Sequence, residues 1–245
     1  MEPVAGSRKL EADTEMLLFW LAVVLLILLA VWELWVCEGA HLGRRFVVAM
    51  YNVAANRYDS IKDFDAAWER RFLGEPLAQA LGSLPGPRIL DVGAGTGRTA
   101  RALLPLLRGE ALLAAVEPSR RMQIVGAGHV ADPRSAWVRA WAQPLPFADD
   151  TFDLVVTLEM LEFTPAPRRA LQEMVRVLRP GGWLLTTNRV GAQAPWILGR
   201  TFPRTTFPEL LERLGLEGVE THAWQVEYDL HWARKPDHVP ARVWS

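Results

Sequence analysis

Residues 89–97 have the sequence ILDVGAGTG, in which an apolar run leads into an aspartate and three glycines. The breaker Pro85-Gly86-Pro87 comes before this run, and residues 98–104 have apolar positions at helical spacing. The glycines therefore lie at a turn from a buried strand to a helix. There they permit positive φ angles and let a ligand approach the N-terminus of the helix. The turn predicts a cofactor site.

The spacing of the glycines separates two classes of cofactor. A dinucleotide fingerprint, G-x-G-x-x-G, would need glycine at position 98, where the chain has Arg98. This weakens a nicotinamide or flavin interpretation. The pattern D-x-G-x-G-x-G instead resembles the first motif of the class I S-adenosylmethionine-dependent methyltransferases, of the type 11 kind. The resemblance implies that the cofactor contacts this turn at Asp91, Gly93, Ala94, Gly95, Thr96 and Gly97. A glycine turn on its own could equally be structural.

A second apolar strand, residues 112–116, delivers Glu117 about 20 positions after the glycines. In a doubly wound sheet, an acidic residue at this place accepts hydrogen bonds from the ribose hydroxyls. The alternative is a solvated carboxylate at the end of a strand. The resemblance implies that Glu117 and Pro118 contact the ribose and that Met122 lies near the adenine.

Residues 144–153, PLPFADDTFD, form a loop before the strand 154–157 and resemble the family's LPF-x-D-x-x-FD segment. The resemblance places Ala142, Gln143 and Leu145 at the cofactor. Relatives usually have an acidic residue here for the adenine amino group, whereas residues 140–143 read AWAQ. Gln143 is the candidate for the edge of the ring. Trp141 either packs on the adenine or belongs to the core.

The pattern of elements predicts an α/β fold. A helix over residues 168–178 stops at the turn RPGG, and a strand over 183–187 follows. A helix over 208–214 precedes two strands, 219–224 and 225–230, which we expect to pair antiparallel. The four ordered motifs cover roughly residues 50–235. They imply a Rossmann-like, doubly wound, mostly parallel seven-stranded sheet with an antiparallel last strand, preceded by one transmembrane helix.

The N-terminal region predicts a membrane anchor. Residues 16–32 contain no charge, and apolar character continues to Cys37 after the single Glu33. A secretory signal is the rival interpretation, but acidic residues precede the segment and no small-x-small cleavage site follows it. We expect a tail (1–15), an anchor helix (16–37), a juxtamembrane and cofactor-capping segment (38–62) and a methyltransferase domain (63–245). We expect Glu33 to reach the lipid headgroups.

The charges beside the anchor set its orientation. Arg44, Arg45 and Arg57 follow the span, whereas Arg8 and Lys9 lie farther from it on the other side. This bias predicts a single-pass protein whose catalytic domain faces the cytoplasm, where S-adenosylmethionine is made. Residues 51–59, YNVAANRYD, resemble the Y-x-x-x-A-x-x-YD segment with which relatives cap the cofactor. Tyr51 and Tyr58 are then cofactor contacts on one face of a helix, or parts of a plain amphipathic helix.

Candidates for chemistry follow the fourth strand, at the edge of the sheet where ligands bind in open α/β folds. Glu159 and Glu162 are the candidate catalytic residues, and Glu159 also belongs to the expected cofactor set. Solvated or salt-bridged carboxylates are the alternative. Methyl transfer needs chiefly an acceptor aligned with the methyl group. Residues 188–207 are rich in Trp, Ile, Leu and Phe, which suits either a hydrophobic acceptor, a membrane-contacting face or a helix packed on the core.

Overall charge and cysteine content argue against several classes of partner and site. The net charge is −1 and the arginines are scattered, so we expect no nucleic-acid partner. One cysteine cannot form an intrachain disulfide or a cysteine-rich zinc site. The five histidines show no metal-ligand spacing, and we expect no metal.

These patterns predict a membrane-anchored S-adenosylmethionine-dependent methyltransferase. Its acceptor is expected to be small and lipophilic, such as a quinone, a lipid or an isoprenoid precursor. The alternative is a noncatalytic methyltransferase-like module that binds the cofactor or scaffolds a membrane complex. A nicotinamide oxidoreductase is a third interpretation, which predicts nicotinamide binding.

Overall fold

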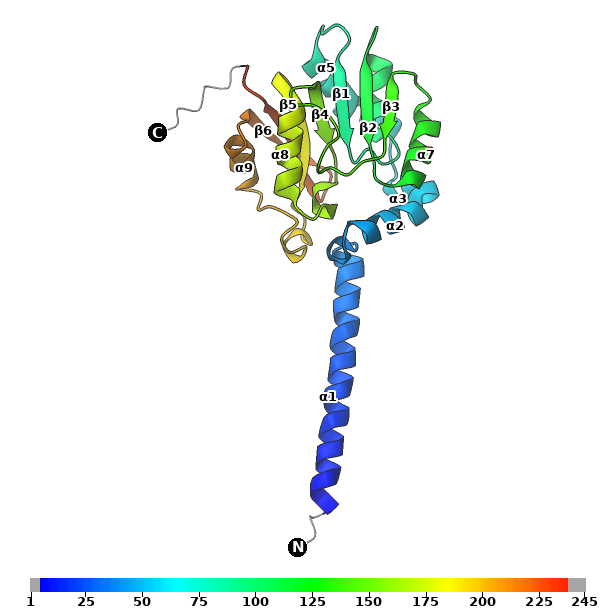
Figure 1. Ribbon diagram of the computed structural model, residues 1–245, viewed down its shortest axis with the longest axis vertical. Coiled ribbons are helices and arrows are strands. Elements are labelled where there is room, and N and C mark those ends of the chain that lie inside the picture. Colours follow the sequence, from blue (N-terminus) through cyan, green and yellow to red (C-terminus); the bar gives the residue numbers. More distant parts are fainter. Residues whose placement is uncertain (1–4, 238–245) are drawn as a thin grey trace, which may run out of the picture.

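The centre of the structure is a twisted sheet whose order is β3-β2-β1-β4-β5-β7-β6 (Figure 1). The structure is a computed structural model that describes residues 5–237, with side chains for Glu11 and from Asp13 onward. Within this range the seven strands are β1 (Arg88–Val92), β2 (Leu112–Val116), β3 (Ser135–Val138), β4 (Phe152–Thr157), β5 (Leu178–Arg189), β6 (Glu217–Trp224) and β7 (Tyr228–Arg234). Only β7 runs antiparallel to its neighbours. This confirms the expected fold class.

Helices cover both faces of the sheet. The helices are α1 (Ala5–Val31), α2 (Arg44–Ala54), α3 (Tyr58–Lys62), α4 (Ala66–Glu69), α5 (Glu75–Leu81), α6 (Arg98–Leu103), α7 (Arg120–Val130), α8 (Pro167–Val177) and α9 (Phe207–Arg213). Leu90 and Val92 pack on the side of α8 and α9, while Ile89 packs with α5 and α6. Because both faces are buried, β1 reads as a nearly continuous apolar run.

Three strands differ from the sequence-based expectation. Strand β5 begins at Leu178, before the glycine pair, because Leu178 already pairs with Phe152 of β4. Strand β3 was implied by the expected count of seven strands but not located, since its half-exposed edge position leaves only a short and weak apolar pattern. The last strand starts at Tyr228 because residues 225–227 form the hairpin turn, with Gln225 at φ 55°.

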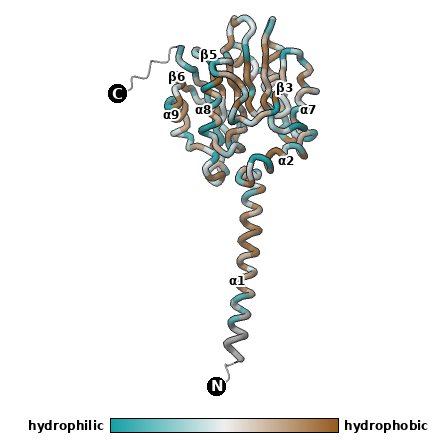
Figure 2. The backbone as a smooth tube through the Cα atoms, viewed as in Figure 1, coloured by the Kyte–Doolittle hydropathy of each residue, from teal (hydrophilic) through white to brown (hydrophobic). Residues whose placement is uncertain are grey.

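The long helix α1 projects away from the sheet, with its N-terminal end farthest from the domain (Figures 1 and 2). The segment Asp13–Val36 is the one described helix long and apolar enough to cross a membrane. Its 24 residues reach about 36 Å at 1.5 Å per residue, against a hydrocarbon core of about 30 Å. Its apolar side chains are exposed, as at Leu26 (66%), so it is not the core helix of the domain. The helix already begins at Ala5, within the expected tail; residues 1–4 and 238–245 of the expected segments lie outside the described residues.

The end of the apolar helix bends sharply into the domain. A π-helix, Trp32–Val36, is followed by Gly39 at φ 76°, and α2 then crosses the carboxyl edge of the parallel strands. Glu33 does not point out to headgroups as expected. It is 7% exposed, and its carboxylate accepts a hydrogen bond from the backbone N–H of His41 at 2.7 Å. The turn at Gly39 brings the chain back onto the helix and so buries this carboxylate.

Candidate cofactor-binding site

The glycine turn after β1 is held open by its backbone conformation. Gly93, Gly95 and Gly97 have φ angles of 77°, 54° and 84°. The N–H groups of Gly93 and Ala94 donate to the carbonyl of Val116 at 2.8 and 3.0 Å. A Cβ atom at Gly93 would lie 2.5 Å from Cγ of Met160, so a larger residue would displace that side chain. The turn therefore brings main chain, without side chains, to the edge of a cavity.

Glu117 is fixed beside this turn by two backbone donors. Its Oε2 accepts from the N–H of Gly95 at 3.0 Å and its Oε1 accepts from the N–H of Ser119 at 2.8 Å. Burial raises the pKa of Glu117 to about 7, although both N–H groups favour the charged form. Burial likewise raises the pKa of Asp91, which is 3% exposed, to about 7. A ligand that brings a positive charge or a hydrogen-bond donor to these carboxylates would lower the pKa of both acids.

A cavity opens between the glycine turn and α2. It contains about 810 Å³ of empty space, open solvent included, which lies within the usual range for small-molecule sites of about 300–1,000 Å³. Ten expected cofactor residues line it: Tyr51, Tyr58, Gly93, Gly95, Glu117, Pro118, Met122, Ala142, Gln143 and Glu159. An adjoining hollow adds Asp91, Ala94 and Thr96. Most of the expected set therefore comes together.

Three expected site residues line neither hollow. Gly97 packs instead against Val130, whose Cγ2 would lie 2.7 Å from an added Cβ. Leu145 belongs to the core at 3% exposure. Glu162 lies behind the cavity wall at 2% exposure and accepts a hydrogen bond from the Tyr228 hydroxyl. Burial raises the pKa of Glu162, although that hydrogen bond opposes the effect.

Several wall residues were not expected from the sequence. They come from α2 and from the segment after β4, and they are Arg44, Val47, Val48, Met160, Phe163, Thr164 and Pro165. Trp141, which follows β3, also lines the cavity, where one of its two expected roles places it. The guanidinium of Arg44 lies 4.6 Å from the ring centre of Trp141. The only signal for the α2 residues was the amphipathic pattern of the juxtamembrane helix, which does not specify what the apolar face meets.

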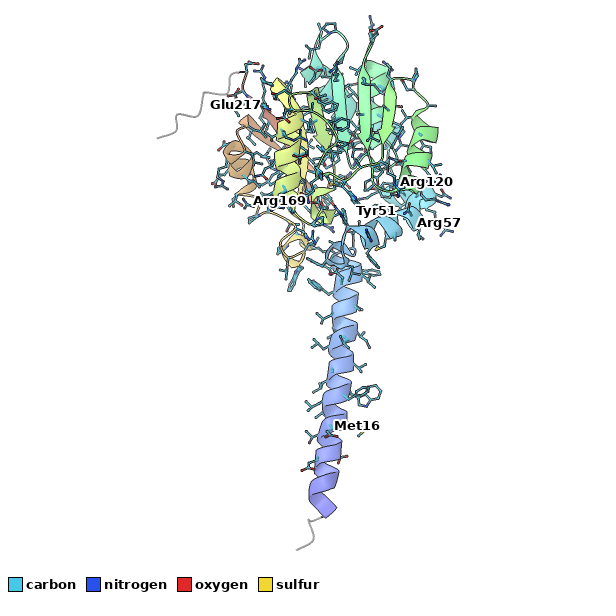
Figure 3. All side chains as sticks on the ribbon, viewed as in Figure 1. Met16, Tyr51, Arg57, Arg120, Arg169 and Glu217 are labelled. Atoms are coloured by element: carbon cyan, nitrogen blue, oxygen red, sulfur yellow. The ribbon has the colours of Figure 1, made fainter. Side chains whose placement is uncertain are left out.

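The segment α2–α3 covers the cavity as a cap. Figure 3 marks Tyr51 where α2 meets the lower end of the sheet. The rings of Tyr51 and Tyr58 lie 5.8 Å apart, although a 3₁₀ turn interrupts the helix between them. Asp59 accepts hydrogen bonds from Arg101, at 2.7 Å, and from the Thr96 hydroxyl. The cap is thus tied to the glycine turn by side chains.

Glu159 takes part in a buried ion-pair network. Its carboxylate oxygens lie 2.8 Å from Nζ of Lys62 and 2.7 Å from Nη1 of Arg98. Arg98 also pairs with Glu69 at 2.7 Å. Burial by itself would raise the pKa of Glu159, but the charges of Lys62 and Arg98 outweigh it and lower the pKa. Glu159 is therefore an ionised side chain at the cavity wall and a weak base.

One buried polar atom in the cavity wall has no protein partner. Oε1 of Gln143 is inaccessible to solvent and accepts no hydrogen bond from any described residue. An orphaned acceptor of this kind costs free energy unless a ligand donates to it. The exocyclic amino group of an adenine is such a donor. The residues present therefore fit an adenosyl cofactor, whose ribose hydroxyls would meet Glu117.

Comparisons with known proteins agree with this geometry. The family model described as "Methyltransferase domain" matches residues 90–186. In these residues the chain is similar to methyltransferase domains. This confirms the resemblance expected from the sequence. The matched residues extend from β1 into β5 and include the glycine turn, Glu117 and Gln143, whereas the cap α2–α3 lies outside them.

Relatives of the methyltransferase domain include the demethylmenaquinone methyltransferase of Renibacterium salmoninarum, 33% identical over 142 residues. The match covers 58% of this chain and 58% of that relative, so the chain spans less than two thirds of its length. Among solved structures, the cyclase SpnF aligns with a TM-score of 0.64 at 21% identity, over 79% of this chain and 96% of that one. An S-adenosyl-L-methionine-dependent methyltransferase from Methanococcus maripaludis aligns with a TM-score of 0.60 at 18% sequence identity. That alignment covers 78% of this chain and 95% of the other. At these identities the two structures share the fold.

Proposed function

We propose that the protein is a membrane-anchored S-adenosylmethionine-dependent methyltransferase with a small lipophilic acceptor. The observation that carries the proposal is the cavity itself. It joins bare main chain at Gly93 and Gly95, the carboxylate of Glu117 and the unpartnered oxygen of Gln143. These groups match the surfaces of an adenosyl ligand and lie inside a methyltransferase domain.

The residues of the cavity would hold the cofactor in distinct ways. Glu117 would accept from the ribose hydroxyls, Gln143 from the adenine amino group, and Asp91 from the ammonium of the amino-acid end. When bound, S-adenosylmethionine supplies an electrophilic methyl group on a sulfonium. Tyr51 and Tyr58 of the cap would exclude water from that group, because α2–α3 closes the cavity on the side away from the sheet.

A lipophilic acceptor follows from the position of the cavity. Phe163 lines the cavity and also packs on the small cluster of Cys37, Ala40 and Ile197 at the end of the apolar helix. Exposed apolar side chains surround the same joint: Trp35 (77%), Trp196 (63%) and Leu198 (65%). If α1 crosses a bilayer, these residues lie at its surface, where Trp is favoured. A hydrophobic acceptor would then reach the cavity without crossing water.

The similarity to a quinone methyltransferase points to the same class of acceptor. The relative from Renibacterium salmoninarum is named for demethylmenaquinone, and we propose that this chain takes a prenylated quinol or a molecule of similar shape. The single-pass orientation with the domain in the cytoplasm is part of the proposal. It is supported by Arg44 and Arg45, which are the first arginines after the span.

The cavity favours an acceptor that reacts without help from a general base of the protein. No described cavity residue is a histidine, lysine or cysteine, and burial raises the pKa of both Tyr51 and Tyr58. A catalytic role for Glu159 and Glu162 stays a prediction. Glu159 fits electrostatic stabilisation of a cationic ligand better than proton abstraction, because its two cations keep it ionised. Holding the acceptor in line would supply most of the rate.

The test measures transfer of labelled methyl groups in membranes that contain the full chain. Membranes are incubated with methyl-labelled S-adenosylmethionine, with and without added prenylated quinols, and the organic extract is analysed for labelled product. We expect product with the wild type and none with Asp91→Ala. Asp149→Ala is the matched control, because Asp149 is an exposed carboxylate that pairs with Arg176, outside the cavity lining.

Other outcomes identify other functions. Label found only in soluble polar metabolites would contradict the lipophilic acceptor. Binding of S-adenosylmethionine without transfer to quinols, phospholipids or isoprenoids would favour the noncatalytic module. The solved cyclase with this fold shows why that outcome is worth measuring, since a fold does not dictate a reaction. Calorimetry with nicotinamide dinucleotides should show no binding.

A further inference from the structure

Three potential metal ligands meet where the apolar helix joins the domain. They are Glu33, Cys37 and His41, and a carboxylate oxygen, the sulfur and a ring nitrogen of these residues all lie within 4.8 Å of one another. The three residues are spaced four apart, as on one face of a helix. The expected span ends at residue 37, so the sequence places His41 outside the helix that holds Glu33 and Cys37. The group lies outside the cofactor cavity.

The two ring contacts of His41 imply a cation between Nδ1 and Glu33. Nε2 lies 2.9 Å from the carbonyl oxygen of Leu198, which can only accept, so Nε2 carries a proton. Nδ1 lies 2.8 Å from Oε2 of Glu33. A neutral imidazole with its proton on Nε2 would point the lone pair of Nδ1 at a carboxylate oxygen. The contact requires a cation between these atoms: a second proton or a metal ion.

We propose that a divalent metal ion of the zinc class binds between Glu33, Cys37 and His41. Imidazole nitrogen, thiolate sulfur and carboxylate oxygen are the ligands that Zn²⁺ takes in proteins. The bond from Nε2 to the Leu198 carbonyl is the outer contact that ligating histidines usually make, and it leaves Nδ1 free for the metal. Binding releases the thiol proton of Cys37 to solvent, and three protein ligands leave a fourth position for water.

The surroundings are already shaped for such an ion. Glu33 is 7% exposed and Cys37 is fully buried. The ring of Trp32 stacks on that of His41, with centres 5.5 Å apart and planes at 17°. Metal–ligand bonds of about 2.0–2.2 Å place neighbouring N and O ligands roughly 3.3 Å apart in a tetrahedron, so the present contact of 2.8 Å would open only slightly. The adjacent Glu38 pairs with Arg189 at 2.9 Å and takes no part.

The metal would connect the end of the span to the apolar loop of residues 194–198. His41 already contacts the carbonyl of Leu198, and the thiol of Cys37 points at the carbonyl of Trp196, 3.7 Å away. An ion that fixes both side chains would fix this loop relative to the helix. It is therefore a structural clamp at the joint, independent of methyl transfer.

The test uses Co²⁺ as the probe, because tetrahedral cobalt with a thiolate ligand has characteristic visible and charge-transfer absorption. The full chain in lipid nanodiscs is stripped with a chelator and titrated with Co²⁺. We expect one equivalent to bind with a thiolate charge-transfer band, and Zn²⁺ to displace it. Cys37→Ser should lose that band, and His41→Ala and Glu33→Gln should each weaken binding by about 100-fold or more, beyond what loss of an outer contact causes.

Matched controls and contrary outcomes complete the design. Glu38→Gln and His129→Ala change the same residue types outside the cluster and should leave binding unchanged. If the His41→Ala protein unfolds, the Cys37→Ser variant alone tests the proposal. Serine is close to cysteine in size, so the fold should persist while the thiolate charge-transfer band of Co²⁺ disappears. Failure of the wild type to take up Co²⁺, or a His41 ring that nuclear magnetic resonance shows doubly protonated with Co²⁺ present, would overturn the proposal. Asp91→Ala should still bind Co²⁺, which separates this site from the proposed activity.

Discussion

At the scale of single residues, the cavity depends on groups that are costly without a ligand. Oε1 of Gln143 is buried without a partner, and Asp91 and Glu117 have raised pKa values because they are buried. Free energy lost at such positions in the empty protein is recovered when a ligand supplies the missing donors or charge. Strongly shifted pKa values such as those of Asp91 and Glu117 cluster at functional sites.

The exchange Gln143→Leu should separate binding from stability. It removes an unsatisfied acceptor, so the free energy of unfolding of the ligand-free protein should stay equal or rise. If Gln143 accepts from the adenine as proposed, the exchange also removes that hydrogen bond, so affinity for S-adenosylmethionine should fall about five- to tenfold. Calorimetry and denaturant unfolding measure the two effects. Gln79→Leu, an exposed glutamine on α5, is the control; unchanged affinity in Gln143→Leu would place the adenine elsewhere.

At the scale of elements, α2–α3 is a cap tied to the domain by a few polar contacts. Asp59 holds α3 to Arg101 and Thr96, and Asn52 of α2 accepts a hydrogen bond from the Ser119 hydroxyl at 2.9 Å. Lys62 at the end of α3 reaches Glu159. These contacts are few and partly exposed, so the cap can open for a cofactor to enter without unfolding the sheet.

The exchange Asp59→Asn should loosen this cap while the fold persists. It keeps the shape of the side chain but removes the charge that Arg101 and Thr96 bind. We expect S-adenosylmethionine to dissociate about tenfold faster, in line with the loss of a charged hydrogen bond, and the amides of residues 51–62 to exchange faster. Stopped-flow displacement and hydrogen exchange measure these effects. Asp63→Asn, a neighbouring exposed carboxylate, should change neither; equal rates in both variants would argue against a moving cap.

At the scale of the whole molecule, the apolar helix and the underside of the domain form one surface. The brown segment of α1 in Figure 2 ends at the joint where Trp35, Trp196 and Leu198 are exposed. The opposite end of the sheet carries Leu112, at the start of β2. An anchored domain would therefore rest on the bilayer with the carboxyl edge of its parallel strands facing the lipid.

Fluorescent labelling can measure that arrangement. The variant Leu198→Cys carries an environment-sensitive dye. When the full chain is moved from detergent to lipid vesicles, the emission of this dye should shift to shorter wavelengths. In vesicles of lipid with brominated tails, the same emission should be quenched. Leu112→Cys is the matched control at the far edge and should be neither shifted nor quenched. The native Cys37 is fully buried and should not take the label. Equal quenching at both positions would contradict the proposed contact with the bilayer.

Much of the fold, and the grouping of most candidate site residues around one cavity, followed from local patterns. The boundaries of β1, β2, β4, α8 and α9 match to within about two residues, because buried strands and amphipathic helices impose distinct periodicities. The glycine turn and Glu117 were found because a close backbone approach demands glycine and an acidic group at a set distance along the chain. Strand β3, the cavity contacts of Arg44, Val47 and Val48 on α2, and the extent of β5 carry no comparable signal.

The sequence by itself determined a glycine turn, an acidic residue beyond it and an apolar helix, because each is recorded within a short stretch by spacing and residue type. Only the tertiary structure decided that Lys62 reaches Glu159, 97 residues away, and that Glu162 lies behind the cavity wall. It also brought His41 back onto Glu33 and left Oε1 of Gln143 without a partner. The physical reason is that hydrogen bonding and ionisation depend on neighbours from distant segments, and packing alone chooses those neighbours.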